Sequence, residues 1–270
     1  MNETTASPAA LDAAADRLRA AAHSGVPCEP IRDLIGRDDL TAAYAVQRRI
    51  IEDRIAAGSR VVGRKIGLTS AAVQEQLGVD QPDFGVLLDD MYFVGGDTIP
   101  VDAVLQPRVE AEVAFVLGDD LDEGALELAE VRAAVAYAVP ALEVCGSRIA
   151  GWDISFGDTV ADNASAGVFV MGPVRKTLDV VEPREVEMSL SIDDEVVSTG
   201  TGAACLGDPL LALQWLARQA RDLGDPLRAG QVVLSGALGP MHPVAPGSTV
   251  TATITGLGTV TATFGEEAAR

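Results

Sequence analysis

Histidine, lysine and cysteine are all scarce in this chain of 270 residues. The only two histidines are His23 and His242, so a metal site built from several histidines is excluded. Three widely spaced cysteines without a CxxC pair do not form a disulfide framework. The chain also shows no signal-peptide pattern at its start and no apolar run near the ~20 residues that cross a bilayer. We therefore predict a protein of the reducing cytoplasm.

Positive charge and aromatic residues are also in short supply. Acidic residues outnumber basic ones by 40 to 20, which gives a net charge of −20. Phosphate backbones and anionic membranes would repel such a surface, so we expect neither a nucleic-acid nor a membrane partner. Aromatic residues make up 4% of the chain, whereas hydrophobic residues make up 48%. These proportions predict a folded protein whose core consists mainly of valine, leucine, isoleucine and alanine.

The pattern of apolar residues changes at about residue 60. Before it, apolar residues recur at helical spacing over 9–22 and 38–57. After it, short β-type runs alternate with glycine and proline, and they are interrupted by two predicted helices, near 124–138 and at 209–223. Helices and strands do not alternate regularly, so a doubly wound parallel sheet is disfavoured. We predict an α+β fold with a helical N-terminal region (1–60) and a β-rich, mixed-sheet body (61–270) that forms one structural unit.

Two glutamates share one face of a predicted strand in the segment QPRVEAEVAFVL. Alternate strand residues point the same way, so Glu110 and Glu112 lie together, with Cα atoms roughly 7 Å apart. An ExE pattern by itself is typical of a half-exposed strand. Here the same face continues as Ala114 and Val116, so the carboxylates border a buried strand and need a partner. The spacing would allow both to bind one cation.

Glu143 is the only acid in the apolar segment AAVAYAVPALEVCGSRI. A buried carboxylate is costly unless it is paired or hydrogen-bonded. One interpretation is a structural ion pair with Arg148, and the other is a third carboxylate for the same cation. Three carboxylates without histidine favour Mg²⁺ or Mn²⁺ over Zn²⁺. Cys145, two residues further along, is predicted as a small core residue.

Lys65 is one of only two lysines and lies in the β-type segment GRKIGLTS. Most lysines are solvated, but the apolar neighbours of Lys65 favour partial burial, where a lysine can donate a proton or hold an anionic substrate. Asp83, in PDFG, is predicted to lie in a tight turn. The polar segment GWDISFGDTVADNASAGVFV is either plain turn structure or a substrate-binding loop.

These segments together resemble the 2-keto-4-pentenoate hydratases of the fumarylacetoacetate hydrolase superfamily. The resemblance runs from about residue 40 to residue 264. The motifs that carry it, in order, are GRKIGLTS, QLGVDQPDFGVL, LQPRVEAEVAFVL, VPALEVCGSRIAGWDISFGDTVADNASAGVFVMG, GAACLGDPLLALQWLA and GQVVLSGALGPM. Each motif is weak by itself, whereas six in the same order are specific.

The resemblance implies roles for seven residues. The metal ligands, for Mg²⁺ or Mn²⁺, would be Glu110, Glu112 and Glu143. Catalysis would fall to Lys65 and Asp83, and Ser165 and Leu68 would contact the substrate. The family often has GHP where this chain has Gly207–Asp208–Pro209, which we interpret as a helix cap. Family members are homo-oligomers, so the resemblance implies a homo-oligomer here, and we expect it to associate with other meta-cleavage enzymes.

The implied reaction adds water to 2-hydroxypenta-2,4-dienoate, by way of its 2-keto tautomer, and gives 4-hydroxy-2-oxopentanoate in the meta-cleavage catabolism of aromatic compounds. Alternatives in the superfamily are 4-oxalocrotonate decarboxylase and 2-oxo-hept-4-ene-1,7-dioate hydratase. Their second substrate carboxylate would need a cation such as Arg64, Arg108 or Arg148. A non-catalytic partner subunit is an alternative of another class, which the complete set of acids and Lys65 disfavours.

Overall fold

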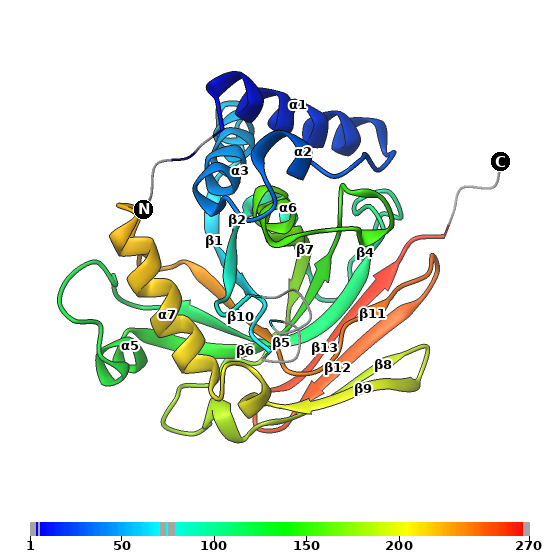
Figure 1. The fold of residues 1–270 in the computed structure, drawn as a ribbon. Helices are drawn as coiled ribbons and strands as arrows, with labels where there is room; N and C mark the ends of the chain where they lie inside the picture. The colour runs from blue at the N-terminus through cyan, green and yellow to red at the C-terminus, as the bar shows by residue number, and fades with distance from the viewer. Residues whose placement is uncertain (1–3, 5, 71–73, 75–78, 267–270) are drawn as a thin grey trace.

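The computed structural model describes residues 4, 6–70, 74 and 79–266, and it has the predicted α+β architecture (Figure 1). The helices gather above and beside two sheets, and the sheets form the body. The helices are α1 (Pro8–Ser24), α2 (Arg32–Ile35), α3 (Leu40–Ala56), α5 (Leu128–Ala133), α6 (Phe156–Ala161) and α7 (Pro209–Asp222). Within the described ranges, no helix combines the length and apolar character that a membrane crossing requires.

Helices α1 and α3 lie within two residues of the predicted ranges 9–22 and 38–57, whereas the short α2 was not predicted. The Ser7 side chain accepts a hydrogen bond from Ala10 N at the start of α1, and Gly25 ends the helix with a φ of 70°. Asp39 caps α3 in the same way. The apolar faces of α1 and α3 pack with Phe156 and Val160 of α6, so this layer rests on a segment of the body (Figure 1). The domain boundary at residue 60 stays a prediction.

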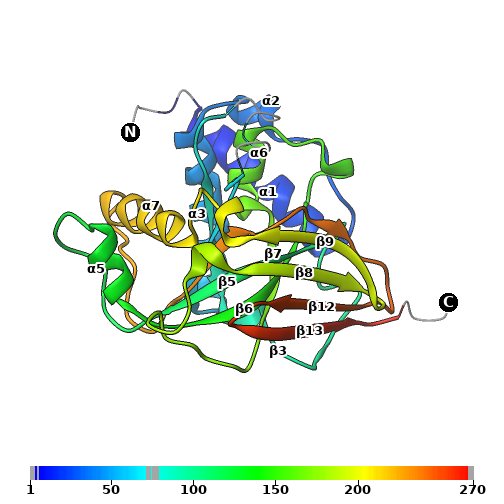
Figure 2. The same cartoon turned by 90° about the horizontal axis from the view of Figure 1, so that it is seen from below.

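The body contains one eight-stranded and one five-stranded sheet within the described residues (Figure 2). The larger sheet has the order β2-β1-β10-β5-β6-β7-β3, with β11 paired to β5, and it is mixed because β1 runs parallel to β10 and β3 to β7. Its strands are β1 (Val61–Gly67), β2 (Asp83–Leu88), β3 (Tyr92–Val94), β5 (Arg108–Leu117), β6 (Val135–Cys145), β7 (Ala166–Met171), β10 (Val232–Ala237) and β11 (His242–Pro243). The smaller sheet consists of β4 (Thr98–Ile99), β8 (Glu187–Ile192), β9 (Glu195–Thr201), β12 (Thr249–Ile254) and β13 (Gly258–Phe264).

Strand β5 is buried on both faces, as its sequence predicts. Val113 and Phe115 point into the core between the two sheets and α7. Ala114 and Val116 belong to a separate apolar cluster on the opposite face. Glu110 and Glu112 lie on this second face, so their carboxylates are enclosed by protein and do not form a solvated edge.

The later helices only partly agree with the sequence-based expectation. Helix α7 is confirmed, with the Asp208 carboxylate accepting a hydrogen bond from Leu210 N and Gly224 in the left-handed region just beyond the helix. The predicted helix near 124–138 is wrong in extent, because α5 covers only Leu128–Ala133 and β6 begins at Val135. The segment forms a strand because β6 pairs with β5 on one side and with β7 on the other. The alanine residues at its start favoured a helix when the sequence was considered alone.

Candidate active site

Strands β5 and β6 bring the three predicted glutamates together. The two strands pair antiparallel with Glu110 directly opposite Glu143 and with Glu112 opposite Ala141. Side chains of opposed residues share a face, so all three carboxylates project to the same side of the sheet. Glu110 is 9% exposed, Glu143 1% and Glu112 fully buried. The sequence pattern therefore identified a real cluster of buried acids.

These buried carboxylates have too few hydrogen-bond donors. Oε2 of Glu112 accepts from Gly236 N at 2.7 Å, but among the described residues nothing donates to its Oε1 or to Oε2 of Glu143, and Oε1 of Glu143 has only the Lys65 ammonium beside it. Burial raises the pKa of Glu143 to about 7, against the opposing effect of Lys65. Burial also raises the pKa of Glu112 well above its ordinary value, and the charges of Glu143 and Glu110 raise it further. The cluster therefore favours a bound cation.

Lys65 supplies one positive charge beside this cluster. It is 2% exposed on β1, its Nζ lies 3.2 Å from Oε1 of Glu143, and it donates a 2.9 Å hydrogen bond to the carbonyl of Ala164. Burial lowers the pKa of Lys65, but the surrounding acids, Glu143 first, outweigh it and leave the pKa well above the ordinary value. Lys65 is therefore an ammonium group, which can donate a proton or attract an anion.

Asp83 lies close to Lys65, but it does not lie in the predicted tight turn. It is the first residue of β2 and pairs with Gly67 of β1. A Cβ atom at Gly67 would come within 2.2 Å of Asp83 Oδ1, so glycine is needed there to make room for the carboxylate. Burial raises the pKa of Asp83 to about 6, although Lys65 opposes the shift. The sequence PDFG is typical of a turn, but from Asp83 onward its backbone pairs with β1 as strand β2.

The polar segment before β7 contains α6 and then a left-handed turn at Asn163, Ala164 and Ser165. The φ values of these residues are 55°, 52° and 56°, which is strained backbone for residues other than glycine. The Asn163 side chain holds the turn by bonding to the backbone N–H and C=O of Val86 at 2.8 and 2.9 Å. The turn in this way aims the Ala164 carbonyl at Lys65. Sequence reasoning missed the roles of Asn163 and Ala164, although both lie in the NAS motif.

Ser165 and Leu68 lie near this group in different settings. Ser165 is buried, and its Oγ shares a 3.1 Å hydrogen bond with Oγ1 of Thr159. Leu68 directly follows β1 with a φ of 56°, and its carbonyl accepts from Nε2 of Gln74 at 2.7 Å. Residues 76–78 of the QLGVDQPDFGVL motif lie outside the described residues.

Of the two interpretations of Glu143, the ion pair with Arg148 is wrong. Arg148 instead pairs with Asp162, with Nε 2.5 Å from Oδ1, and it also donates to the carbonyls of Asp162 and Ala166. It thereby holds both ends of the left-handed turn. The strand geometry accounts for the error, because β6 ends at Cys145 and Arg148 lies beyond it, away from Glu143.

Cys145 also borders the acids, which its prediction as a small core residue did not anticipate. The thiol is buried, but Sγ lies 3.6 Å from Oε1 of Glu110. Ligand atoms of Glu110, Glu143 and Cys145 all lie within 4.8 Å of one another. The available signal was its spacing, since Cys145 follows Glu143 by two residues and shares its strand face.

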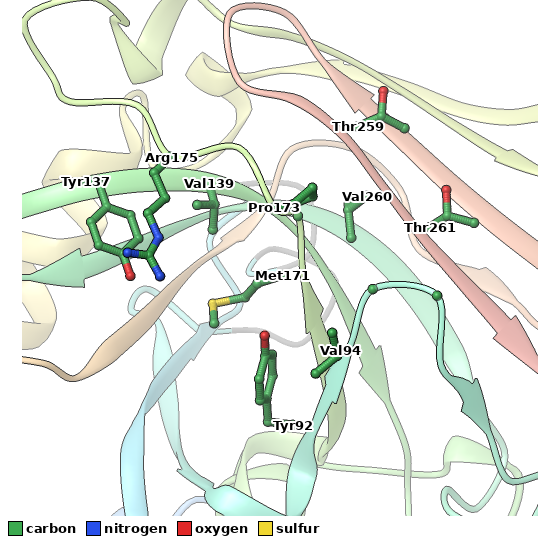
Figure 3. A pocket seen from close by; sticks show the side chains of 13 residues that line it. Tyr92, Val94, Tyr137, Val139, Met171, Pro173, Arg175, Thr259, Val260 and Thr261 are labelled. Carbon is green, nitrogen blue, oxygen red and sulfur yellow. The ribbon is translucent and has the colours of Figure 1, made fainter.

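Two cavities of the fold lie away from the acids. One of about 390 Å³ lies between the edge of the larger sheet and β13, where Tyr92, Tyr137, Met171 and Arg175 line it (Figure 3). Another of about 640 Å³ reaches Arg148 and Asp162 behind the left-handed turn. Neither cavity is lined by Lys65, Asp83 or a glutamate of the cluster. The candidate site is therefore identified from its buried charged side chains and not from a cavity.

Comparison with known proteins identifies the family. The family model described as fumarylacetoacetate (FAA) hydrolase C-terminal matches residues 61–265, most of the chain. The chain belongs to the fumarylacetoacetate hydrolase family. Within this family it is 54% identical to a TodF product hydratase of Pseudomonas putida, over 96% of this chain and 97% of that protein. It is 53% identical to a 2-keto-4-pentenoate hydratase of Paraburkholderia xenovorans, over 95% and 96%.

A solved structure of the family has the same overall shape. It is a 4-oxalocrotonate decarboxylase from Pseudomonas putida G7, complexed with magnesium and adipate, and it is 32% identical to this chain. The alignment covers 97% of this chain and 100% of that one, with a TM-score of 0.92. The resemblance to 2-keto-4-pentenoate hydratases that the motifs indicated is thus confirmed, within a fold that also supports a decarboxylase.

Proposed function

We propose that this protein is a metal-dependent hydratase that adds water to 2-hydroxypenta-2,4-dienoate and forms 4-hydroxy-2-oxopentanoate. The observation that carries the proposal is the cluster of Glu110, Glu112 and Glu143, which is buried without enough donors and adjoins an ammonium group. Relatives at about 50% identity that are named hydratases support the reaction class. The substrate places the enzyme in meta-cleavage catabolism of aromatic compounds.

The three glutamates would hold the cation. Their donors are all carboxylate oxygens, which suit Mg²⁺ or Mn²⁺, and relatives crystallised with magnesium or with Mn²⁺ support this choice. When bound, such an ion acts as a Lewis acid that stabilises negative charge on the 2-oxygen of the substrate. Glu112 is fixed for this task by its hydrogen bond from Gly236 N, and Glu143 by its ion pair with Lys65.

Lys65 and Asp83 would move the protons. As the dienol becomes a ketone, the 2-hydroxyl loses a proton and C5 gains one; as water then adds, the water loses a proton while its oxygen bonds to C4, and C3 gains a proton. The ammonium of Lys65 can donate, and the carboxyl of Asp83, with a pKa of about 6, is mostly ionised at neutral pH and can accept. Ser165 and Leu68, on the neighbouring turn and strand end, would contact the substrate.

Arginine pairing favours this hydratase over enzymes that act on dicarboxylates. Arg64 is paired with Asp225, and Arg148 is paired with Asp162. Arg108 stacks on Trp152, with its guanidinium carbon 4.7 Å from the ring centre. Of the three arginines considered for a distal carboxylate, two are therefore already paired with acids of this chain. A monocarboxylate substrate needs none of them.

Rates on four substrates, with and without Mg²⁺ or Mn²⁺, test the proposal. The substrates are the pentadienoate, its methylated homologue, the heptene-dioate and oxalocrotonate. We expect metal-dependent hydration that is fastest on the pentadienoate or its methylated homologue. Faster turnover of either dicarboxylate would contradict the proposed substrate, and no turnover of any would support a non-catalytic partner subunit. We also propose that the protein assembles as a homo-oligomer and associates with other enzymes of the pathway.

The two lysines offer a matched pair of variants for the same assay. Lys65→Ala should lower turnover by about 10²–10⁴-fold, because a general acid contributes on that order. Lys176→Ala should leave turnover unchanged, since Lys176 lies on the segment after β7, where its backbone bridges to Ala138. Equal rates for the two variants would contradict the role of Lys65.

A further inference from the structure

We propose that Glu110, Glu143 and Cys145 form a second metal site that overlaps the carboxylate site and takes a thiophilic divalent cation, such as Zn²⁺ or Cd²⁺. The inference rests on the proposed function in one respect, which is that both ions would use Glu110 and Glu143. Cys145 would replace Glu112 in the second set. A thiophilic ion bound in this way would exclude the catalytic one and inhibit the enzyme.

Strand geometry gives this set of residues its position. Cys145 is the last residue of β6 and lies on the same face as Glu143, opposite Arg108 in the register with β5. Its Sγ is 3.6 Å from Oε1 of Glu110, and one donor atom from each of the three residues lies within 4.8 Å of the others. Donors around a tetrahedral zinc ion with Zn–S near 2.3 Å are separated by roughly 3.5 Å. Small side-chain shifts would therefore complete the site.

A hydrogen bond from the thiol to Glu110 explains only part of this arrangement. It accounts for the 3.6 Å distance, but Oε2 of Glu143 still has no hydrogen-bond donor among the described residues, and Oε1 has only the Lys65 ammonium at 3.2 Å, although Glu143 is 1% exposed. Groups that are buried to this degree are normally satisfied. A cation bound by Cys145, Glu110 and Glu143 would give these buried carboxylates the partner that they lack.

The chemistry of the donors determines which ion each set selects. Carboxylates alone favour hard ions, whereas a thiolate favours Zn²⁺ and Cd²⁺. As the metal–sulfur bond forms, the thiol releases its proton to water, so the ligand binds as a thiolate. Glu112 keeps its hydrogen bond from Gly236 N and is not needed by the thiophilic ion. The two sites therefore differ by one ligand and cannot be filled at once.

Cadmium titration of the metal-free protein tests the site without relying on activity. Binding of Cd²⁺ to a thiolate gives an ultraviolet charge-transfer band. We expect this band in the wild type and its loss in Cys145→Ser. The matched controls are Cys28→Ser and Cys205→Ser, which remove the two other cysteines of the chain and should keep the band. Glu110→Gln should weaken Cd²⁺ binding by about 10–100-fold or more.

Glu112→Gln separates the two sites. It should retain the cadmium band and its affinity, while its affinity for Mn²⁺ falls. If Cys145→Ser does not fold, X-ray absorption of the zinc-loaded wild type still decides the question, because a sulfur ligand appears at about 2.3 Å and an all-oxygen set does not. Zinc without sulfur, or a cadmium band that survives Cys145→Ser, would overturn the proposal.

Failure of this site and failure of the proposed function have different signatures. An absent cadmium band together with normal Mn²⁺-dependent hydration would overturn only the thiophilic site. A cadmium band that depends on Cys145, in a protein without hydratase activity, would support the site and contradict the function. In an active enzyme, excess Mn²⁺ should displace Cd²⁺, and a lack of competition would overturn the shared ligands.

Discussion

Two groups of buried acids in this molecule are similar in exposure but opposite in their surroundings. Asp158 and Asp162, in and just after α6, are as buried as Glu112 and Glu143 in the sheet. Asp158 accepts hydrogen bonds from the backbone N–H groups of Ile31, Arg32 and Ser155 and from the Ser155 hydroxyl. Asp162 accepts from the backbone and guanidinium of Arg148. The glutamates have no comparable set of donors among the described residues.

The difference shows that burial alone does not distinguish a structural acid from a functional one. Burial raises the pKa of Asp162, but the Arg148 guanidinium opposes it. Burial also raises the pKa of Glu112, and neighbouring carboxylates add to the increase. A structural acid has its charge neutralised within the chain, whereas the glutamates leave negative charge for an ion from outside.

Loss of Arg148 should have the largest effect on stability. Arg148→Met leaves the Asp162 carboxylate buried without its cation, which should lower the free energy of unfolding by about 3–5 kcal/mol. Urea denaturation of the wild type and the variant measures this change. Adding Asp162→Asn should recover part of the loss, because it removes the uncompensated charge. A loss below about 1 kcal/mol would mean that Asp162 does not depend on Arg148, and the contrast would fail.

The sequence predicted the glutamates better than it predicted their neighbours. Alternation along one strand is local information, so Glu110 and Glu112 could be placed on one face, and burial of that face follows from Ala114 and Val116. The pairing of Glu110 with Glu143 joins residues on two strands, so the residues alone left a shared cation as one of two interpretations, and the resemblance favoured it.

Long-range contacts account for what the sequence could not provide. The partner of Arg148 depends on where β6 ends, because Arg148 lies beyond the strand and reaches Asp162 instead of Glu143. The sequence did not show where this strand begins or ends. The position of Asp83 opposite Gly67 depends on a pairing across a segment of fifteen intervening residues, so a turn was the simpler local interpretation. The left-handed turn has only a weak local signal, because Asn163 can adopt this conformation readily, whereas Ala164 and Ser165 rarely do.

Asp83 should behave like the glutamates when pH is varied. Its pKa is raised from 3.8 to about 6, so the folded protein keeps a proton that the unfolded chain has lost between pH ~4 and ~6. The stability of the metal-free wild type should therefore fall as pH rises through this window, by about 3 kcal/mol from this group. The amide side chain of the Asp83→Asn variant cannot ionise, so the variant should become increasingly more stable than the wild type as pH rises above ~4. This difference in stability should stay constant above pH ~6. Parallel stability curves for the two proteins would show that Asp83 is already neutralised, like Asp162.

Glu112→Gln should give the smallest change in stability, and its sign distinguishes the two groups of acids. Glutamine retains an oxygen that can accept from Gly236 N, and it removes a charge that repels Glu143. The metal-free variant should therefore be more stable than the wild type by about 1–3 kcal/mol, while its affinity for Mn²⁺ should fall by about 10–100-fold or more.

Asp158→Asn is the matched control for that variant. It replaces one acceptor of the hydrogen bonds that tie α6 to Ile31 and Arg32 with an amide N–H₂ donor, so it should lower stability and leave the Mn²⁺ affinity unchanged. Denaturation of the metal-free proteins and calorimetric titration with Mn²⁺ measure both quantities. If Glu112→Gln destabilised the metal-free protein as Asp158→Asn does, Glu112 would be a structural acid. Stabilisation by Glu112→Gln together with destabilisation by Asp158→Asn is expected only if the Glu112 carboxylate serves to bind an ion and does not stabilise the fold.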